Sequence, residues 1–192
     1  TRCSRDWSSD VCSSDLYVET LKRFARAVVT FEDLGEGAEK ANLLVSDLYR
    51  NRKVPRDRQL NGVRNAILSP AFNDTVEPIP FRQHVEHILV VFGGTDPSGL
   101  TFKTLEALRN IHFPGFVSVV RGLGAAELPP LHEYGLNGEV LHNVAHMPSL
   151  MAKVDLAVSS AGRTITELLT LGSCKRIGLI IVPIRLSCLC SI

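Results

Sequence analysis

The sequence has almost no excess of charge and no thiol in its central part. Its 21 basic and 20 acidic side chains give a formal net charge of +1. This balance provides no electrostatic footprint for nucleic acid or for an anionic membrane surface. The body of the protein also lacks the residues of a disulfide framework or a zinc site. All five cysteines lie in the two terminal segments, at Cys3, Cys12, Cys174, Cys188 and Cys190.

Long apolar runs are missing as well. A membrane-spanning helix needs about 20 successive apolar residues, but Lys175 and Arg176 bound the apolar tail and Arg185 interrupts it. We therefore expect a cytoplasmic protein without a membrane-spanning segment. No D-x-D pair occurs, and the six histidines show no metal-ligand spacing. The sequence therefore predicts neither a metal nor a cofactor.

The first part of the chain divides into segments of different character. Residues 1–16 are rich in Ser, Asp and Cys and resemble translated sequencing-adapter read-through, so we predict a disordered, non-native leader. Residues 17–80 are predicted to be a short α/β remnant of one domain. It contains strands at 27–31 and 42–46, a surface loop at 51–61, and a proline-containing crossing to the next domain at 63–80.

Residues 81–192 are predicted to form a second domain in which strands and helices alternate. Such alternation is typical of an α/β fold with a Rossmann-like parallel sheet and helices on both faces. Ligands of these sheets bind at the carboxyl ends of the strands. The predicted strands are 87–92, 116–120, 139–144, 156–160 and 177–182. The predicted helices are 100–111, with Leu100, Leu105, Leu108 and Ile111 on one face, 148–153, and 163–171, which Gly172 ends.

The stretch from Val154 to Gly172 has the pattern of an anion site. A strand leads through the small-residue turn 159–162 into a helix, whose first N–H groups have no partner inside the helix. Arg163 would add a fixed positive charge, and Glu167, one turn further on, could accept from the two hydroxyls of a ribose. The alternative is a capping box, in which Thr164 and Glu167 bond each other's backbone and no ligand is needed.

A second glycine-rich turn, Gly93 to Gly99, follows the strand 87–92. Gly94 and Gly99 have the glycine spacing of a phosphate loop, but Leu100 stands where that motif requires lysine, so we reject an ATP or GTP site. The dinucleotide fingerprint is also absent. Two readings stay open, namely a tight turn whose backbone and Thr95 hydroxyl approach a ligand and a plain strand-to-helix turn. Both glycine-rich turns lie at carboxyl ends of strands, so they can face one crevice.

Three separated motifs then carry a family resemblance. Residues 91–97 (VFGGTDP), 143–151 (NVAHMPSLM) and 155–172 resemble the C-terminal half of GT-B nucleotide-sugar enzymes. The resemblance is strongest to the UDP-sugar hydrolases of pseudaminic acid biosynthesis and their relatives in spore-coat and sialic-acid-like sugar pathways. Family 28 glycosyltransferases share this half. Residues 31–35 (FEDLG) and 44–49 are similar to the end of the N-terminal domain in the hydrolase group.

The resemblance implies a UDP-sugar site at the two turns. Gly94 and Thr95 would contact the diphosphate, Val144 would pack beside the uracil, and Arg163 and Thr164 would lie at the phosphates. Glu167 would hold the ribose diol. The candidate substrate-binding residues are therefore Gly93, Gly94, Thr95, Val144, Gly162, Arg163, Thr164 and Glu167.

The resemblance also implies an activity that this chain does not fully carry. In the hydrolases the catalytic histidine lies near the start of an N-terminal domain that has no counterpart here, so no catalytic residue is assigned. After residue 172 the family continues with a polar segment, whereas residues 173–192 are apolar and Cys-rich, which suggests a frameshift. We interpret the chain as a fragment of a UDP-sugar-processing GT-B enzyme that cleaves the sugar–diphosphate bond by hydrolysis, in nonulosonic (pseudaminic or sialic-acid-like) or surface polysaccharide biosynthesis. The alternatives are a family 28-like glycosyltransferase and a nucleotide-binding module without turnover.

Overall fold

The computed structural model describes residues 14–47, 49–73, 82–160, 162–171 and 178–182. The chain divides into two compact units, Thr1–Ile67 and Leu68–Ile192. All five cysteines, the predicted helix stop at Gly172 and all of the predicted frameshifted tail except residues 178–182 lie outside the described residues. Residues 74–81 also lie outside them, so the predicted domain boundary after residue 80 stays a prediction.

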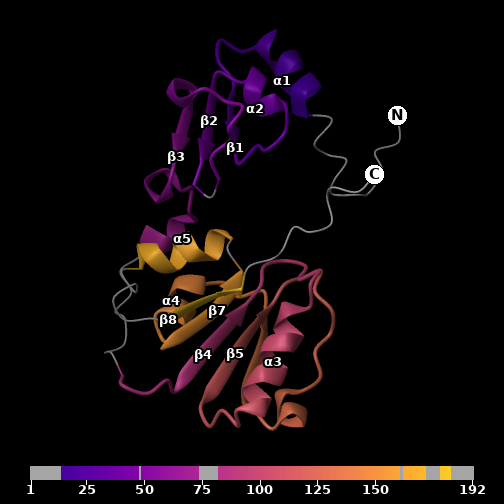
Figure 1. Cartoon of the computed structure of the whole chain (residues 1–192), viewed down its shortest axis with the longest axis vertical. Helices are drawn as coiled ribbons and strands as arrows, with labels where there is room; N and C mark the ends of the chain where they lie inside the picture. The colour runs from indigo at the N-terminus through magenta and orange to yellow at the C-terminus, as the bar shows by residue number, and fades with distance from the viewer. Residues whose placement is uncertain (1–13, 48, 74–81, 161, 172–177, 183–192) are drawn as a thin grey trace. The chain divides into compact units, whose positions relative to one another are not determined.

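The first unit is built on a three-stranded parallel sheet of order β1-β2-β3 (Figure 1). Leu44 of the central strand is 1% exposed and packs with Ala38 and Val54, so a small apolar core lies on one face of this sheet. The elements are α1 (Ser14–Lys22), β1 (Val29–Phe31), α2 (Gly37–Lys40), β2 (Leu43–Ser46), the 3₁₀ turn η2 (Arg56–Arg58), β3 (Gln59–Asn61) and the 3₁₀ turn η3 (Val63–Asn65).

Two expectations for this unit are wrong. The predicted surface loop 51–61 contains β3, which pairs with β2 although its sequence, QLN, has one apolar residue. Buried hydrogen bonds hold it, because the Gln59 side chain donates to the carbonyl groups of Asn51 and Val54. The predicted disordered leader ends in helix, since α1 begins at Ser14 and Asp15 forms an ion pair with Lys40 at 3.2 Å.

The second unit confirms the predicted α/β class. Its five strands are all parallel and have the order β6-β5-β4-β7-β8. The elements are the 3₁₀ turn η4 (Pro70–Asn73), β4 (His87–Val91), α3 (Leu100–Asn110), β5 (Phe116–Arg121), the 3₁₀ turn η5 (Leu131–Tyr134), β6 (Asn137–His142), α4 (Met147–Met151), β7 (Leu156–Ser160), α5 (Arg163–Thr170) and β8 (Gly178–Val182).

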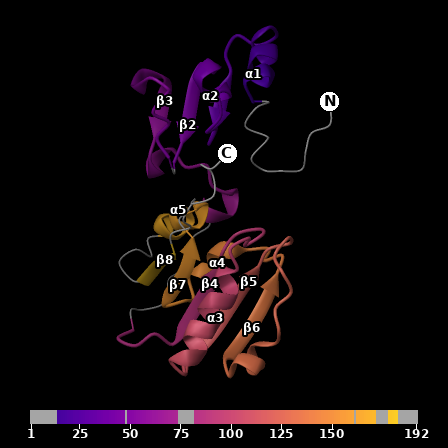
Figure 2. The ribbon, with the colours of Figure 1, turned by 45° about the vertical axis from the view of Figure 1, so that its right-hand side comes forward.

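Both faces of the second sheet are covered. Successive side chains of β4 point to opposite faces, and since those on both faces are buried, each face must have a covering layer. Ile88 and Val90 pack in the cluster that contains Leu105 of α3. Leu89 and Val91 point to the other face, into the cluster formed with residues of α4 and α5. Figure 2 shows α3 on one face of the sheet and α4 and α5 toward the other. The carboxyl ends of the strands are therefore flanked by helices from both layers.

Two details of this unit differ from the sequence-based expectations. The strand β6 begins at Asn137 and ends at His142, two residues earlier than predicted. Ile111 does not lie on the inner face of α3, because the helix ends at Asn110 and the next turn directs this side chain outward, leaving it 70% exposed. Phe113 packs against the core instead.

Candidate functional site

The order in which strands are added to the sheet reverses between β4 and β7. These two strands are neighbours, with Val91 paired to Ser159. The chain leaves β4 through α3 toward β5 on one side, and it leaves β7 through α5 toward β8 on the other. Such a topological switch point leaves a crevice at the carboxyl ends of the strands, which is the general ligand position in open parallel sheets. Both predicted turns begin at this point.

The turn between β4 and α3 presents Gly93, Gly94 and Thr95 as exposed residues. The start of α3, however, is already occupied by a carboxylate. Asp96 accepts from the backbone N–H of Leu100 at 2.9 Å and of Thr101 at 2.8 Å. Sequence analysis missed this residue, although aspartate just before a helix is a common capping signal. Any ligand contact of this turn must therefore come from residues 93–95 and not from the α3 terminus.

The turn between β7 and α5 differs from it. The helix begins at Arg163, with Gly162 as its N-cap residue and no side-chain capping bond. The capping-box alternative is therefore wrong for this helix, because Thr164 is its second residue and not its N-cap. Arg163 is exposed and Thr164 half-buried. The first N–H groups of α5 thus keep the partial positive charge of a helix start, with a guanidinium beside them.

Glu167 is the half-buried carboxylate of this helix. Burial raises the pKa of its carboxyl group above the usual range, and the positive charge of Arg163 opposes part of that rise. Within the described part of the chain, no group donates a hydrogen bond to this carboxylate. A half-buried carboxylate without a donor is destabilising unless a ligand supplies one. Its position favours a ligand with hydroxyl groups.

The structure brings the other candidate residues only partly together. Val144 follows β6 and is half-buried, so it lies at the same edge of the sheet, but β5 separates β6 from β4. A cavity of about 220 Å³ is lined by Gly93 together with Asp96, Arg121 and Gly122. None of the α5 candidates lines this cavity. The two turns share an edge of the sheet, while the distance between Thr95 and Thr164 stays a prediction.

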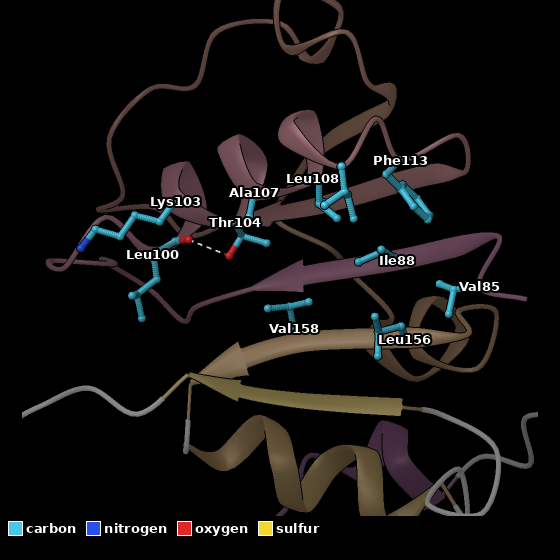
Figure 3. Close-up of a pocket in the computed structure, with 11 residues that line it drawn as sticks. Val85, Ile88, Leu100, Lys103, Thr104, Ala107, Leu108, Phe113, Leu156 and Val158 are labelled. Carbon is cyan, nitrogen blue, oxygen red and sulfur yellow. Dashed lines mark hydrogen bonds between the residues drawn. The ribbon is translucent and has the colours of Figure 1, made fainter.

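A larger hollow lies elsewhere, between α3 and the faces of β4 and β7. It has a volume of about 540 Å³ and an almost wholly apolar lining that includes Ile88, Leu156 and Val158 (Figure 3). Its polar groups are already bonded, since the Thr104 hydroxyl donates to the Leu100 carbonyl at 2.8 Å and Lys103 to the Ser98 carbonyl at 3.0 Å. Because the lining is almost wholly apolar, this hollow does not have the set of polar groups that a phosphate and a ribose would need.

A cluster of three polar side chains, one from each of β4, β5 and β6, links these neighbouring strands. The Nε2 atom of His87 lies 2.9 Å from the Ser118 hydroxyl, which donates to Glu139 at 3.0 Å. Burial lowers the pKa of His87. The serine lies between the histidine and the glutamate, whereas a serine nucleophile requires the histidine in the middle. Ser118 is also 0% exposed, so a substrate does not reach it.

The described residues contain neither a metal-binding cluster nor a membrane-spanning helix. No group of three or more His, Cys, Asp or Glu side chains there could hold a metal ion. No helix among them is long and apolar enough to cross a membrane.

These features define an α/β fold with a Rossmann-like parallel sheet that is flanked by helices. The crystal structure of Acinetobacter baumannii MurG is similar to the chain, with a TM-score of 0.53 and 19% identity over 92% of this chain and 57% of that one. A glycotransferase of kitacinnamycin is similar with a TM-score of 0.45 and 18% identity, covering 94% of this chain and 45% of that one. At such identities the likeness to MurG shows the fold alone.

Among curated proteins, the uncharacterized protein MJ1062 of Methanocaldococcus jannaschii is 25% identical over 181 residues, which cover 81% of this chain and 36% of that protein. No protein-family model matches the sequence. The chain therefore spans about a third of the length of this curated relative and just over half of MurG.

Proposed function

We propose that the second unit binds the nucleoside diphosphate of a UDP-sugar at the edge shared by β4 and β7. The observation that carries this proposal is the switch point, where two glycine-rich turns follow neighbouring parallel strands. The likeness of the fold to the glycosyltransferase MurG supports it. The intact protein would then be a sugar-processing enzyme of which this chain supplies the donor-binding part.

The diphosphate is assigned to the start of α5. Its N-cap residue, Gly162, makes no side-chain capping bond and Arg163 is the first helical residue, whereas the Asp96 carboxylate accepts from the first N–H groups of α3. An anion near an uncapped helix start gains about 0.3–1 kcal/mol from the helix dipole alone, and hydrogen bonds to the N–H groups and the guanidinium add to this. Gly93, Gly94 and Thr95 would contact the same diphosphate from the neighbouring turn.

The ribose is assigned to Glu167. Its carboxylate lacks a donor within the described residues. The 2′ and 3′ hydroxyls of a ribose are two adjacent donors that can bond to the two oxygens of one carboxylate. The uracil is assigned to the region of Val144 because this residue follows β6 at the same edge of the sheet. Strand β5 lies between β6 and the switch point, so a nucleotide held at α5 would extend past the end of β5 to reach Val144.

The reaction we favour is glycosyl transfer. The bond between the anomeric carbon and the diphosphate oxygen breaks, a hydroxyl of a sugar or lipid acceptor bonds to that carbon, and the acceptor's proton passes to a base. The α5 start would stabilise the leaving diphosphate. The fold likeness to MurG supports transfer over hydrolysis by water. Neither the pseudaminic acid pathway nor another surface-polysaccharide pathway gains support from the comparisons.

Titration calorimetry with UDP, CDP and ADP tests the proposal. We expect UDP to bind and the other two nucleotides to bind more weakly. We also expect that the chain by itself releases no free sugar from a UDP-sugar, because no residue in it is assigned as the base. Failure of UDP to bind, or equal binding of all three nucleotides, would refute the UDP assignment.

A further inference from the structure

The turn after β5 lies against the turn after β4 at backbone distance. A Cβ atom on Gly122 would overlap the carbonyl oxygens of Gly93 and Gly94. The N–H of Gly124 donates to the Gly94 carbonyl at 2.9 Å. The β5 turn is itself closed, because the Arg121 guanidinium donates to the Ala125 carbonyl at 3.1 and 3.2 Å. The two turns therefore form one packed unit at the carboxyl edge.

From this packing we propose that Gly122 is a positioning residue for the nucleotide site. It does not contact the nucleotide itself. Its missing side chain lets Gly93, Gly94 and Thr95 lie where they can reach the ligand. The role of Gly122 as a ligand-positioning residue rests on the proposed function of these three residues. The packing of the two turns does not depend on that function.

A side chain at Gly122 would displace the β4 turn and not the sheet. The end of β5 is paired on both sides, with Val120 opposite Val91 of β4 and Leu141 of β6, so it is held in place. The β4 turn is fixed at its far end by Asp96, whose carboxylate bonds to the start of α3. Between these anchors lie the exposed residues 93–95. These are the residues that must move.

A matched control exists at the other end of the same strand. A Cβ atom on Gly115, just before β5, would overlap the backbone carbonyl of Glu86 and the ring of Phe113. Gly115→Ala is therefore expected to lower stability, as Gly122→Ala does, because both substitutions force backbone to shift. Gly115, however, lies at the amino edge of the sheet, away from the turns. A purely structural role predicts the same behaviour for both variants.

The test compares the full chain with its Gly122→Ala and Gly115→Ala variants. We expect Gly122→Ala to raise the Kd for UDP by about 5-fold or more, equivalent to at least one lost hydrogen bond. Gly115→Ala should bind UDP as the unchanged chain does. In the free protein, the amide chemical shifts of Gly93, Gly94 and Thr95 should move in Gly122→Ala only. The positioning role would be overturned if Gly122→Ala and Gly115→Ala lost equal UDP affinity. It would also be overturned if Gly122→Ala shifted the amide signals of residues 93–95 but bound UDP with unchanged affinity.

A milder variant covers the case in which Gly122→Ala fails to fold. A Cβ atom on Gly124 would lie 3.0 Å from Cγ2 of Thr95, so Gly124→Ala should weaken UDP binding through that methyl group. Thr95→Ser removes the methyl, and a double-mutant cycle should show that the two changes are coupled. Additive effects would contradict the inference. If the unchanged chain binds no UDP, the proposed function is refuted, and the amide shifts alone decide whether the β5 turn positions residues 93–95.

Discussion

Replacing Glu167 by glutamine should weaken UDP binding without weakening the fold. The carboxylate has no donor within the described residues, and burial raises its pKa. Glutamine keeps the shape but loses the charge and one of the two acceptor oxygens. Hydrogen bonds to a charged group contribute about 1.5–3 kcal/mol, and a partly exposed pair contributes less. We therefore expect a loss of about 1–3 kcal/mol in calorimetry, which is about 5- to 150-fold in Kd.

The same substitution has a second, opposite effect on the free protein. Because the folded pKa of Glu167 is raised, the folded state takes up a proton more readily than the unfolded state does. Stability from this group is therefore present at low pH and is lost as pH rises from about 4.5 through the folded pKa. At neutral pH the ionised carboxylate destabilises the free fold. Glu167→Gln should then melt no lower than the unchanged chain at pH 7.

An exposed glutamate on another helix provides the control. Glu106 on α3 is exposed, so Glu106→Gln should alter neither UDP affinity nor the melting temperature at pH 7. The reasoning is refuted if Glu167→Gln binds UDP as tightly as the unchanged chain and melts at a lower temperature. That result would mean that the carboxylate supports the fold through a bond that glutamine cannot make.

Three further predictions concern charge and pH. Arg163→Gln should weaken UDP binding by about 1 kcal/mol, which is a modest loss because the side chain is exposed. It should also make the UDP affinity less sensitive to salt. An unchanged salt dependence in calorimetry would contradict a contact between Arg163 and a phosphate. Asp155→Ala should lower the free energy of unfolding by about 1.5–3 kcal/mol in urea, because its carboxylate accepts from the backbone N–H groups of Glu86 and His87 at 3.0 and 2.9 Å. Its Kd for UDP should not change, since it lies at the amino edge, and a parallel loss of affinity would argue against that separation. Burial lowers the pKa of His87 in the folded state, so the unfolded state takes up its proton first and stability should fall as pH drops below about 6.5. Urea denaturation between pH 5 and 8 should show this decline in the unchanged chain and a smaller one in His87→Gln, and identical slopes would exclude His87 as its source.

The central strands of the second sheet were predictable because each contains a continuous apolar run. A strand buried on both faces needs no alternation, and residues 88–91 (ILVV) and 156–158 (LAV) form the continuous apolar runs that this requires. The short strand β3 was not predictable in the same way. Its pairing depends on hydrogen bonds from Gln59 to carbonyl groups five to eight residues earlier, and a local hydrophobic pattern contains no signal of that kind.

The sequence could predict that the candidate site lies at the carboxyl edge of the sheet, but it could not predict how the turns at that edge are arranged. That two turns follow carboxyl ends could be read from the sequence, but their adjacency depends on the strand order, which brings β4 beside β7 although residues 92–155 separate them in the chain. The Asp96 cap could have been read from the aspartate before the helix. The approach of Gly122 to Gly93 and Gly94 could not, because it joins turns from different strands and involves only backbone atoms.

The contrast between the two helix starts explains how one edge of this sheet could select a single diphosphate orientation. At α3 an internal carboxylate already accepts from two N–H groups, so a phosphate there would have to displace a negative charge held by the protein itself. At α5 the N-cap is glycine and the neighbouring charge is positive. A diphosphate lying across the switch point would therefore be attracted at α5 and repelled from the α3 start, with residues 93–95 limited to backbone and hydroxyl contacts. Replacing Asp96 by asparagine would remove that repulsion, and a gain in affinity for inorganic pyrophosphate without a matching gain for UDP would show that the two helix starts had become equivalent anion sites.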